Sequence, residues 1–267
     1  MSSSSADDPT QTSPATSEWS GRHSAKDALR SRIWTDLKAQ KAVRRDPFGH
    51  IPDFLGADLA AQELADLPVW QQAQVIKCNP DSPQKPVRLR ALQDGKTLYM
   101  AVPRLTRQQC FVELKAKALA AQGIPLETAA TLRDALIHGR PVSFDQMEPV
   151  DLVVVGCVAV SPDGGRTGKG AGFADLELGM MAQFGLVQPQ TPIVTTVHAL
   201  QVVNPGQLPM QPHDWPLDWF VTPDAAMATQ TRYERPLGLD WQAIQPEQYQ
   251  KIPVLRSLRP TPDPAEP

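Results

Sequence analysis

Residues 151–185 constrain the fold more than any other part of this chain. Residues 151–160 are almost entirely apolar and β-branched, which predicts a strand buried on both faces. The following SPDGG sequence, residues 161–165, is typical of a turn. After a glycine-rich stretch, residues 173–184 predict a helix that Gly185 closes. The segment therefore predicts a strand, a glycine-rich loop and a helix in direct succession.

The glycine-rich stretch has the composition of a phosphate-binding loop. Arg166 and Lys169 lie among Gly168, Gly170 and Gly172, just before the predicted helix. Backbone amides and the helix dipole favour an anion at such a position. The spacing fits neither the Walker A loop nor the G-x-G-x-x-G dinucleotide motif. We favour a phosphate site over a merely tight connection, because two cations lie within the loop.

The rest of the chain alternates predicted strands and helices. This alternation indicates an α/β fold with three layers, in which helices cover both faces of a mostly parallel sheet. In such sheets ligands bind beyond the carboxyl ends of the strands, so residues 79, 103, 161–172 and 222 are expected on one rim. Residues 198–203 either continue a strand or begin its neighbour. The other predicted strands are residues 73–78, 97–102, 192–197 and 217–222; the other predicted helices begin at residue 24 and cover 58–67, 82–93, 107–122 and 128–138, with a helical turn at 223–229.

Composition narrows the class of protein. The 267 residues are 41% hydrophobic, enough for one large core or two small ones. We expect a single domain over residues 23–258, with disordered tails at 1–22 and 259–267. The net charge of −3 argues against a dominant nucleic-acid or anionic-membrane surface. The start of the chain lacks the features of a secretory signal, and no apolar run is long enough to span a bilayer. Cys78, Cys110 and Cys157 form neither a C-x-x-C motif nor a disulfide framework, which fits a reducing cytoplasm. At least Cys78 and Cys157 lie in apolar stretches and are expected to be buried thiols.

Three separated motifs resemble those of the 5-formyltetrahydrofolate cyclo-ligase family. The family motif R-x-G-[RK]-G-x-G-Y-Y-D is matched by RTGKGAGFAD, which begins at Arg166 and ends at Asp175. A helix motif K-x-x-x-R is matched by Lys26 and Arg30. A third motif, P-x-x-x-x-D-x-x-[VL]-D, is matched by PMQPHDWPLD around Asp214. The chain is most similar to the divergent methenyltetrahydrofolate synthase domain-containing branch, through DLVVVGCVAVS, GKGAGFADLE and RPLGLDW.

The resemblance implies both a fold and an activity. The fold would be that of the cyclo-ligases and of the NagB, RpiA and CoA-transferase group. The activity would be the ATP- and Mg²⁺-dependent cyclisation of 5-formyltetrahydrofolate to 5,10-methenyltetrahydrofolate, a ligase reaction of one-carbon metabolism in the cytoplasm. The expected partners are the folate substrate and ATP, with neither nucleic acid nor a membrane, and the oligomeric state is left open.

The resemblance also implies residue roles, each with a simpler structural alternative. Lys26 and Arg30 would reach ATP phosphates, although their spacing alone favours solvated cations. Phe173 would stack on the ligand or pack in the core. Asp175 and Asp214 would hold Mg²⁺, or serve as a carboxylate at a helix N-terminus and as a turn residue. The remaining roles belong to the glycine-rich stretch, where catalysis would fall to Arg166 and Lys169 and phosphate binding to the amides of Gly168, Gly170 and Gly172.

Two departures from the family pattern keep other functions open. The paired tyrosines are replaced by Phe173-Ala174, and the glutamate expected after the first strand is missing from the NPDSP sequence at residues 79–83. A second hypothesis is therefore a relative that binds a nucleotide or a folate without turnover. A third is an enzyme that acts on a different substrate, because a fold and a phosphate loop do not determine the chemistry.

Overall fold

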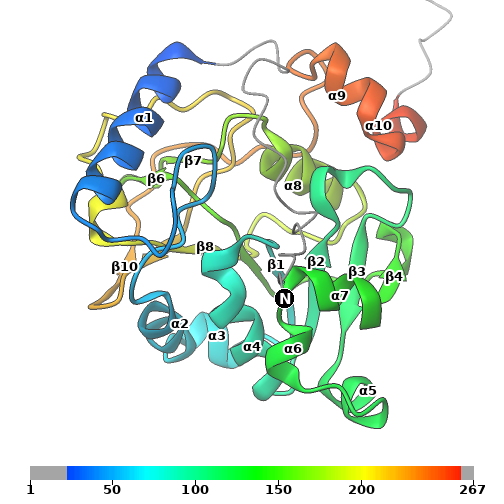
Figure 1. Cartoon of the computed structure of the whole chain (residues 1–267). Coiled ribbons are helices and arrows are strands. Elements are labelled where there is room, and N and C mark those ends of the chain that lie inside the picture. Colours follow the sequence, from blue (N-terminus) through cyan, green and yellow to red (C-terminus); the bar gives the residue numbers. More distant parts are fainter. Residues whose placement is uncertain (1–22, 260–267) are drawn as a thin grey trace, which may run out of the picture.

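A computed structural model describes residues 23–259 (Figure 1). Eight strands form one sheet in the order β10-β9-β8-β5-β1-β2-β3-β4, and two further strands, β6 and β7, form a separate antiparallel pair. The strands are β1 (Val75–Cys78), β2 (Thr97–Ala101), β3 (Phe111–Leu114), β4 (Arg140–Val142), β5 (Leu152–Val154), β6 (Ala159–Val160), β7 (Arg166–Thr167), β8 (Ile193–Thr196), β9 (Trp219–Val221) and β10 (Ala226–Ala228).

The centre of the large sheet is parallel. β2, β1, β5, β8 and β9 pair in parallel, whereas β3, β4 and β10 join antiparallel at the two edges. The register places Ile76 between Leu98 and Leu152. The prediction of an α/β fold with a mostly parallel sheet is therefore confirmed.

Helices cover both faces of this sheet. The α-helices are α1 (Ser24–Ala39), α2 (Ala57–Ala65), α3 (Pro68–Gln72), α4 (Lys85–Gln93), α5 (Ala116–Ala121), α6 (Leu126–Ala129), α7 (Leu132–His138), α8 (Phe173–Gln183), α9 (Pro246–Lys251) and α10 (Pro253–Leu258). Short 3₁₀ turns cover Ser82–Gln84, Pro103–Leu105, Phe144–Gln146 and Ala199–Gln201. Figure 1 shows α2, α3, α4 and α6 below the strands, with α8, α9 and α10 above them.

Alternation along the strands divides the core into two layers. In β1, Ile76 and Cys78 pack toward the layer of α2 to α7, while Val75 faces the layer of α8 and α10. This period of two is what a pleated strand imposes when both of its faces are covered. A third cluster joins α1 to β6 through Ile33, Leu37 and Ala159. Among the helices of residues 23–259, none is long and apolar enough to cross a membrane.

The long apolar segment of residues 151–160 is not one strand. It leaves the large sheet after β5, and its last part becomes β6 of the small sheet. The neighbouring strand β1 ends at the Asn79-Pro80 turn, and proline has no N–H with which to continue a ladder. At Gly156 a Cβ would lie 2.9 Å from Asp81 Oδ2, so the chain passes directly over that turn.

The predicted helix at residues 107–122 is wrong in its first half. Phe111–Leu114 forms β3, because its apolar side chains are buried between β2 and β4, and only Ala116–Ala121 is helical. Pairing within a sheet has overridden the helical pattern there. The predicted turn at 223–229 is instead strand β10, which follows a tight turn between Thr222 and Ala225. Residues 198–203 form a 3₁₀ turn followed by a single bridge from Val160 to Val202.

The three cysteines are buried free thiols, as expected, and burial raises the pKa of Cys78 to about 11 and that of Cys110 to about 12. That residues 23–258 form a single domain stays a prediction. The two predicted tails lie outside the described residues, except for Arg259.

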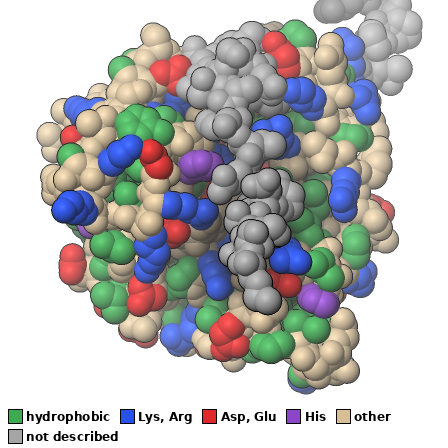
Figure 2. Space-filling model, in the orientation of Figure 1, with side chains coloured by type: hydrophobic (Ala, Val, Ile, Leu, Met, Phe, Trp, Pro, Cys, Tyr) green, Lys and Arg blue, Asp and Glu red, His purple; other side chains and the backbone are tan. Residues whose placement is uncertain are grey.

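On the face of the molecule in Figure 2, Lys and Arg side chains alternate with Asp and Glu side chains. As far as the described residues show, the cations do not gather into one basic area on that face.

Candidate functional site

The glycine loop, residues 168–172, connects the small β6–β7 sheet to the N-terminus of α8. Gly170 and Gly172 have φ values of 113° and 69°, a region that glycine enters without strain. Gly172 is also the N-cap of α8, so the loop runs directly onto the first amides of that helix. A Cβ placed on Gly168 would meet no described atom within 4 Å. The loop therefore has the open, amide-rich form that suits an anion.

Arg30 of α1 holds the first part of this loop. Its Nε donates to the Gly168 carbonyl at 2.6 Å, and a terminal nitrogen donates to Thr167 Oγ1 at 2.8 Å. Its other terminal nitrogen pairs with Asp27 at 2.5 Å. Both Arg30 and Lys26 are buried, so the alternative of two solvated cations is wrong.

Lys26 extends the contact of α1 to the segment of the third motif. Its ammonium group pairs with Asp214 Oδ2, which also accepts a hydrogen bond from the Gln211 amide at 2.6 Å. Asp214 is buried as well. The ion pair joins two segments that lie 188 positions apart in the sequence.

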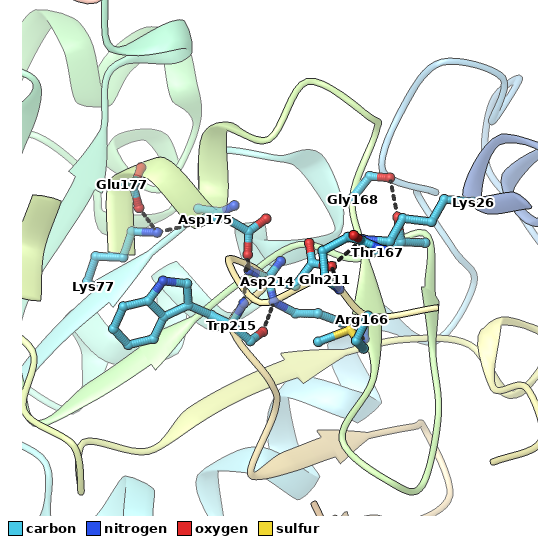
Figure 3. Close-up of polar contacts among 12 residues, drawn as sticks. Lys26, Lys77, Arg166, Thr167, Gly168, Asp175, Glu177, Gln211, Asp214 and Trp215 are labelled. Carbon is cyan, nitrogen blue, oxygen red and sulfur yellow. Dashed lines mark hydrogen bonds and ion pairs between the residues drawn. The ribbon is translucent and has the colours of Figure 1, made fainter. Parts of the chain in front are cut away.

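Arg166, which is buried, and Asp175, which is partly buried, form the second ion pair of the site (Figure 3). Arg166 is 2% exposed, and its Nε donates to the Trp215 carbonyl at 2.7 Å. Asp175 Oδ1 accepts from both the Arg166 guanidinium and the Trp215 amide, the latter at 2.9 Å. Burial raises the pKa of Asp175, and the nearby Asp214 charge adds to this effect, although Arg166 opposes it. Burial alone would lower the pKa of Arg166, but the charge of Asp175 and further contacts raise it.

Lys169 lies apart from these pairs. Its side chain is 47% exposed, and its ammonium group lies 2.9 Å from Asp81 Oδ1. Burial would raise the pKa of Asp81, but Lys169 and neighbouring cations hold that pKa below its usual range. Because Asp81 follows the end of β1, this contact puts the turn after β1 and the glycine loop on one rim of the sheet, as expected for residues 79 and 161–172.

The two carboxylates expected to hold Mg²⁺ lie near each other, because Asp175 accepts from the Trp215 amide and Asp214 directly precedes Trp215 in the chain. Asp175 uses Oδ1 and Asp214 uses Oδ2 for the contacts described, which leaves one oxygen of each without a protein partner among residues 23–259. Within the same residues no cluster of three or more His, Cys, Asp or Glu side chains could hold a metal ion. Mg²⁺ is often held by one or two carboxylates together with substrate phosphates, so this pair fits that mode of binding.

Beside the start of α8 lies a pocket whose empty volume, including its open mouth, is about 370 Å³. One side consists of Gly172, Asp175, Leu176 and His213, and the other consists of residues between 238 and 248. Phe173 does not line this pocket; it is partly buried against the core layer of α8. Core packing is thus its observed contact, and a stacking role stays a prediction.

One buried ion pair near the site was not anticipated. Lys77 of β1 is fully buried, pairs with Glu177 of α8, and donates to Asn79 Oδ1 at 2.5 Å. Burial raises the pKa of Glu177, while Lys77 opposes the change. A lysine within the apolar VIKC strand is the signal that could have indicated a buried partner, because lysine is rarely buried unpaired.

Comparisons with known proteins identify a family for this chain. The 5-formyltetrahydrofolate cyclo-ligase family matches residues 22–223. A human relative, "Methenyltetrahydrofolate synthase domain-containing protein", is 40% identical over 237 residues, which cover 88% of this chain and 61% of the relative. A Danio rerio relative of the same name is 35% identical over 233 residues, which cover 86% of this chain and 60% of the relative. The chain thus spans about three-fifths of the length of these curated relatives.

Among solved structures, the NMR structure of Aquifex aeolicus 5,10-methenyltetrahydrofolate synthetase aligns with a TM-score of 0.49 at 20% identity, covering 81% of this chain and 97% of that one. The family match extends over most of the described residues and includes all three motifs. This chain belongs to the 5-formyltetrahydrofolate cyclo-ligase family.

Proposed function

We propose that this protein cyclises 5-formyltetrahydrofolate to 5,10-methenyltetrahydrofolate at the expense of ATP, with Mg²⁺. One observation carries the proposal. Three motifs from distant parts of the sequence meet at the glycine loop, through the Lys26–Asp214 and Arg166–Asp175 pairs and the contact of Arg30 with Gly168. Family membership supplies the class of reaction.

In this reaction the protein mainly positions the two substrates and neutralises the charge of the phosphates. The formyl oxygen of the substrate is a poor leaving group, and N10 of the folate must attack the carbon that carries it. When bound, ATP would supply the phosphoryl group that activates this oxygen, and Mg²⁺ would neutralise phosphate charge. The protein's task is then to hold the phosphates and to keep the formyl oxygen in line.

Phosphate binding falls to the glycine loop and Lys169. The amides of Gly168, Gly170 and Gly172 and the N-terminus of α8 would surround the phosphates. Lys169 would turn from Asp81 to the transferred phosphoryl group. This movement is inexpensive in free energy, because an ion pair with a half-exposed lysine contributes little to stability.

The buried cations would act through the groups they hold. Arg30 fixes the loop through Gly168, and Arg166 fixes the carboxylate of Asp175 at the start of α8. Lys26 fixes Asp214 in the same way. Asp175 and Asp214 would each offer their second oxygen to Mg²⁺, within reach of phosphates on the loop. Direct contact of Lys26, Arg30 or Arg166 with a phosphate would require the present hydrogen bonds to rearrange.

Product formation tests the proposal directly. Purified protein is incubated with 5-formyltetrahydrofolate and Mg-ATP, and the absorbance of the methenyl product is followed together with phosphate release. We expect the two products in equal amounts, and none when ATP is omitted. Binding of ATP without either product would rule out the cyclo-ligase reaction.

A second candidate function is binding of a nucleotide or a folate without turnover. The Phe173-Ala174 sequence in place of two tyrosines favours it, because one aromatic ring and both hydroxyl groups of the family motif are missing. Saturable binding of ATP or 5-formyltetrahydrofolate with no methenyl product would support this candidate.

A further inference from the structure

The pocket at the start of α8 has a wall that lies outside the family match. That match ends at residue 223, whereas the chain continues and returns to α8. Residues 238–248, the C-terminal wall, contribute Gly238, Leu239, Asp240, Ala243, Ile244 and Gln248 to the pocket. The side that faces the glycine loop therefore belongs to the family match, and the opposite side is additional to it.

The C-terminal wall packs closely on α8. A Cβ on Gly179 would lie 3.0 Å from Leu239 Cδ2 and 3.1 Å from the Gly238 carbonyl oxygen. The wall can approach the helix this closely because position 179 carries no side chain. Farther along, Gln248 is buried, donates to the Ala171 carbonyl at 2.9 Å, and accepts from the Gln245 amide at 2.9 Å. The wall is therefore bonded to the glycine loop itself.

The segment that leads into the wall is bonded to the loop between α8 and β8 and to the residue before β9. Arg235 pairs with Asp218 at 2.6 Å and donates to the carbonyls of Pro189 and Thr191 at 2.7 and 2.8 Å. Fixed at Arg235 and again at Gln248, the wall has a set position across the pocket. A rigid wall of this kind can select ligands by shape.

The residues that line the pocket suit a heterocyclic ring better than a phosphate group. Leu176, Leu239 and Ile244 provide apolar surface on both sides. Asp240 supplies a carboxylate on the C-terminal wall, and the described lining contains neither lysine nor arginine, so an anion is disfavoured beside that wall. Asp240 uses Oδ1 to accept from the amides of Gln242 and Ala243. Apolar faces with a carboxylate acceptor suit a flat nitrogen heterocycle that carries amino or ring N–H donors.

We propose that the C-terminal wall is part of the ligand site and holds an amino-bearing nitrogen heterocycle, while the phosphates lie along the glycine loop. The inference rests on the proposed function, whose two ligands both contain such a ring: the adenine of ATP and the pteridine of the folate. Leu239, Asp240 and Ile244 are then determinants of specificity that the three cyclo-ligase motifs do not include, although Leu239 and Asp240 lie in the RPLGLDW segment shared with the divergent branch.

Filling the pocket tests this proposal. Ala243→Trp places a large side chain in the pocket, and Ala120→Trp, on the exposed surface of α5, is the matched control. Calorimetric titrations use ATP, 5-formyltetrahydrofolate and inorganic tripolyphosphate, which has no ring. We expect Ala243→Trp to weaken one of the two ring ligands at least about tenfold, a loss equivalent to one good contact. Affinity for tripolyphosphate stays unchanged, and the affected ligand identifies the ring.

Asp240→Asn provides a second test that does not depend on a bulky side chain. Asparagine retains an oxygen for the turn at Gln242 and Ala243 but removes the acceptor charge. We expect roughly tenfold weaker binding of the same ring ligand. If both variants bind ATP and 5-formyltetrahydrofolate as the unaltered protein does, the wall has no role in binding, even where methenyl product is still formed. If the unaltered protein binds neither ring ligand, the proposed function fails together with this inference.

Discussion

The carboxylate of Asp175 contacts the guanidinium of Arg166 and the backbone amide of Trp215, so a single side chain at the start of α8 joins β7 to the segment before β9. Arg166 completes the ring of contacts by donating to the Trp215 carbonyl. These residues come from two of the three family motifs. The motifs therefore define a structural junction as well as a ligand site.

Removing the cation of this junction should destabilise the fold strongly. Arg166→Met leaves the partly buried Asp175 carboxylate without its counter-ion and the Trp215 carbonyl without its donor, and we expect a loss of about 2–3 kcal/mol in the free energy of unfolding. Urea denaturation measures the change. Arg140→Met removes an arginine that pairs with Glu113 but is 56% exposed, and should lower stability by at most about 1 kcal/mol. Equal losses in the two variants would mean that the Arg166 pair is no more important than a surface pair.

Lys169→Ala should separate nucleotide binding from stability. Because the lysine is half-exposed, we expect a change of at most about 0.5 kcal/mol in the free energy of unfolding. Affinity for Mg-ATP should fall roughly tenfold, the effect of losing one charge-assisted contact to phosphate. Titration calorimetry measures it, and Lys38→Ala, an exposed lysine of α1 paired with Asp46, is the control. Unchanged affinity would remove Lys169 from the phosphate site.

The carboxyl group of Asp163 should make the free energy of unfolding depend on pH in the acidic range. Burial would raise the pKa of this carboxyl group, but bonds from Ser161 Oγ, the Gly206 amide and the Tyr233 hydroxyl, together with the charge of Arg232, hold it below its ordinary value of 3.8. The fold thus favours the ionised form. Ionised Asp163 stabilises the fold at pH values above the pKa that this group has in the unfolded chain. That stabilisation is lost as the pH falls through the lower pKa that the group has in the folded protein.

Asp163→Asn tests this dependence. We expect the variant to be less stable by on the order of 1–3 kcal/mol near neutral pH, because a charged acceptor is lost. The difference between the two proteins should shrink as the pH falls below 3.8. Urea denaturation at several pH values measures both quantities, with Asp66→Asn at the exposed end of α2 as the control. A difference that does not vary with pH would show that the Asp163 charge is not what stabilises this region.

The central strands and α8 could be predicted because the apolar pattern of each segment favours the same element that its contacts in the fold require. The glycine loop also lies between strand and helix as expected. Phe111–Leu114 could not be predicted as β3, because its strand character comes from β2 and β4, which are distant in the sequence. The break after β5 depends on where β1 ends, which is likewise a property of the neighbouring strand.

The candidate site, too, could be predicted from the sequence only in part. The motifs indicated that Lys26, Arg30 and Asp214 belong near the loop. They could not indicate that Lys26 pairs with Asp214, since the choice of partner depends on where α1 packs. The contribution of Gln248 had no local signal at all, because it follows from the return of the chain to α8.

The buried Lys77–Glu177 pair allows a complete double-mutant cycle. Lys77→Met alone leaves Glu177 buried without its counter-ion, and we expect a loss of about 3–5 kcal/mol in the free energy of unfolding near neutral pH. Burial already raises the pKa of Glu177, and loss of the lysine raises it further. The folded variant then keeps a proton that the unfolded chain releases, so its stability falls as pH rises through the raised pKa.

Urea denaturation at about pH 5 and about pH 8 should therefore find Lys77→Met closer to the unaltered protein at the lower pH. The double variant Lys77→Met/Glu177→Met replaces both charges by apolar groups of similar length, and its stability should return to within about 1 kcal/mol of the unaltered protein or exceed it. Such a recovery would show that Lys77→Met loses stability because the Glu177 carboxylate is left without a counter-ion. A double variant as unstable as Lys77→Met would instead mean that the lysine side chain stabilises the core through packing or through Asn79.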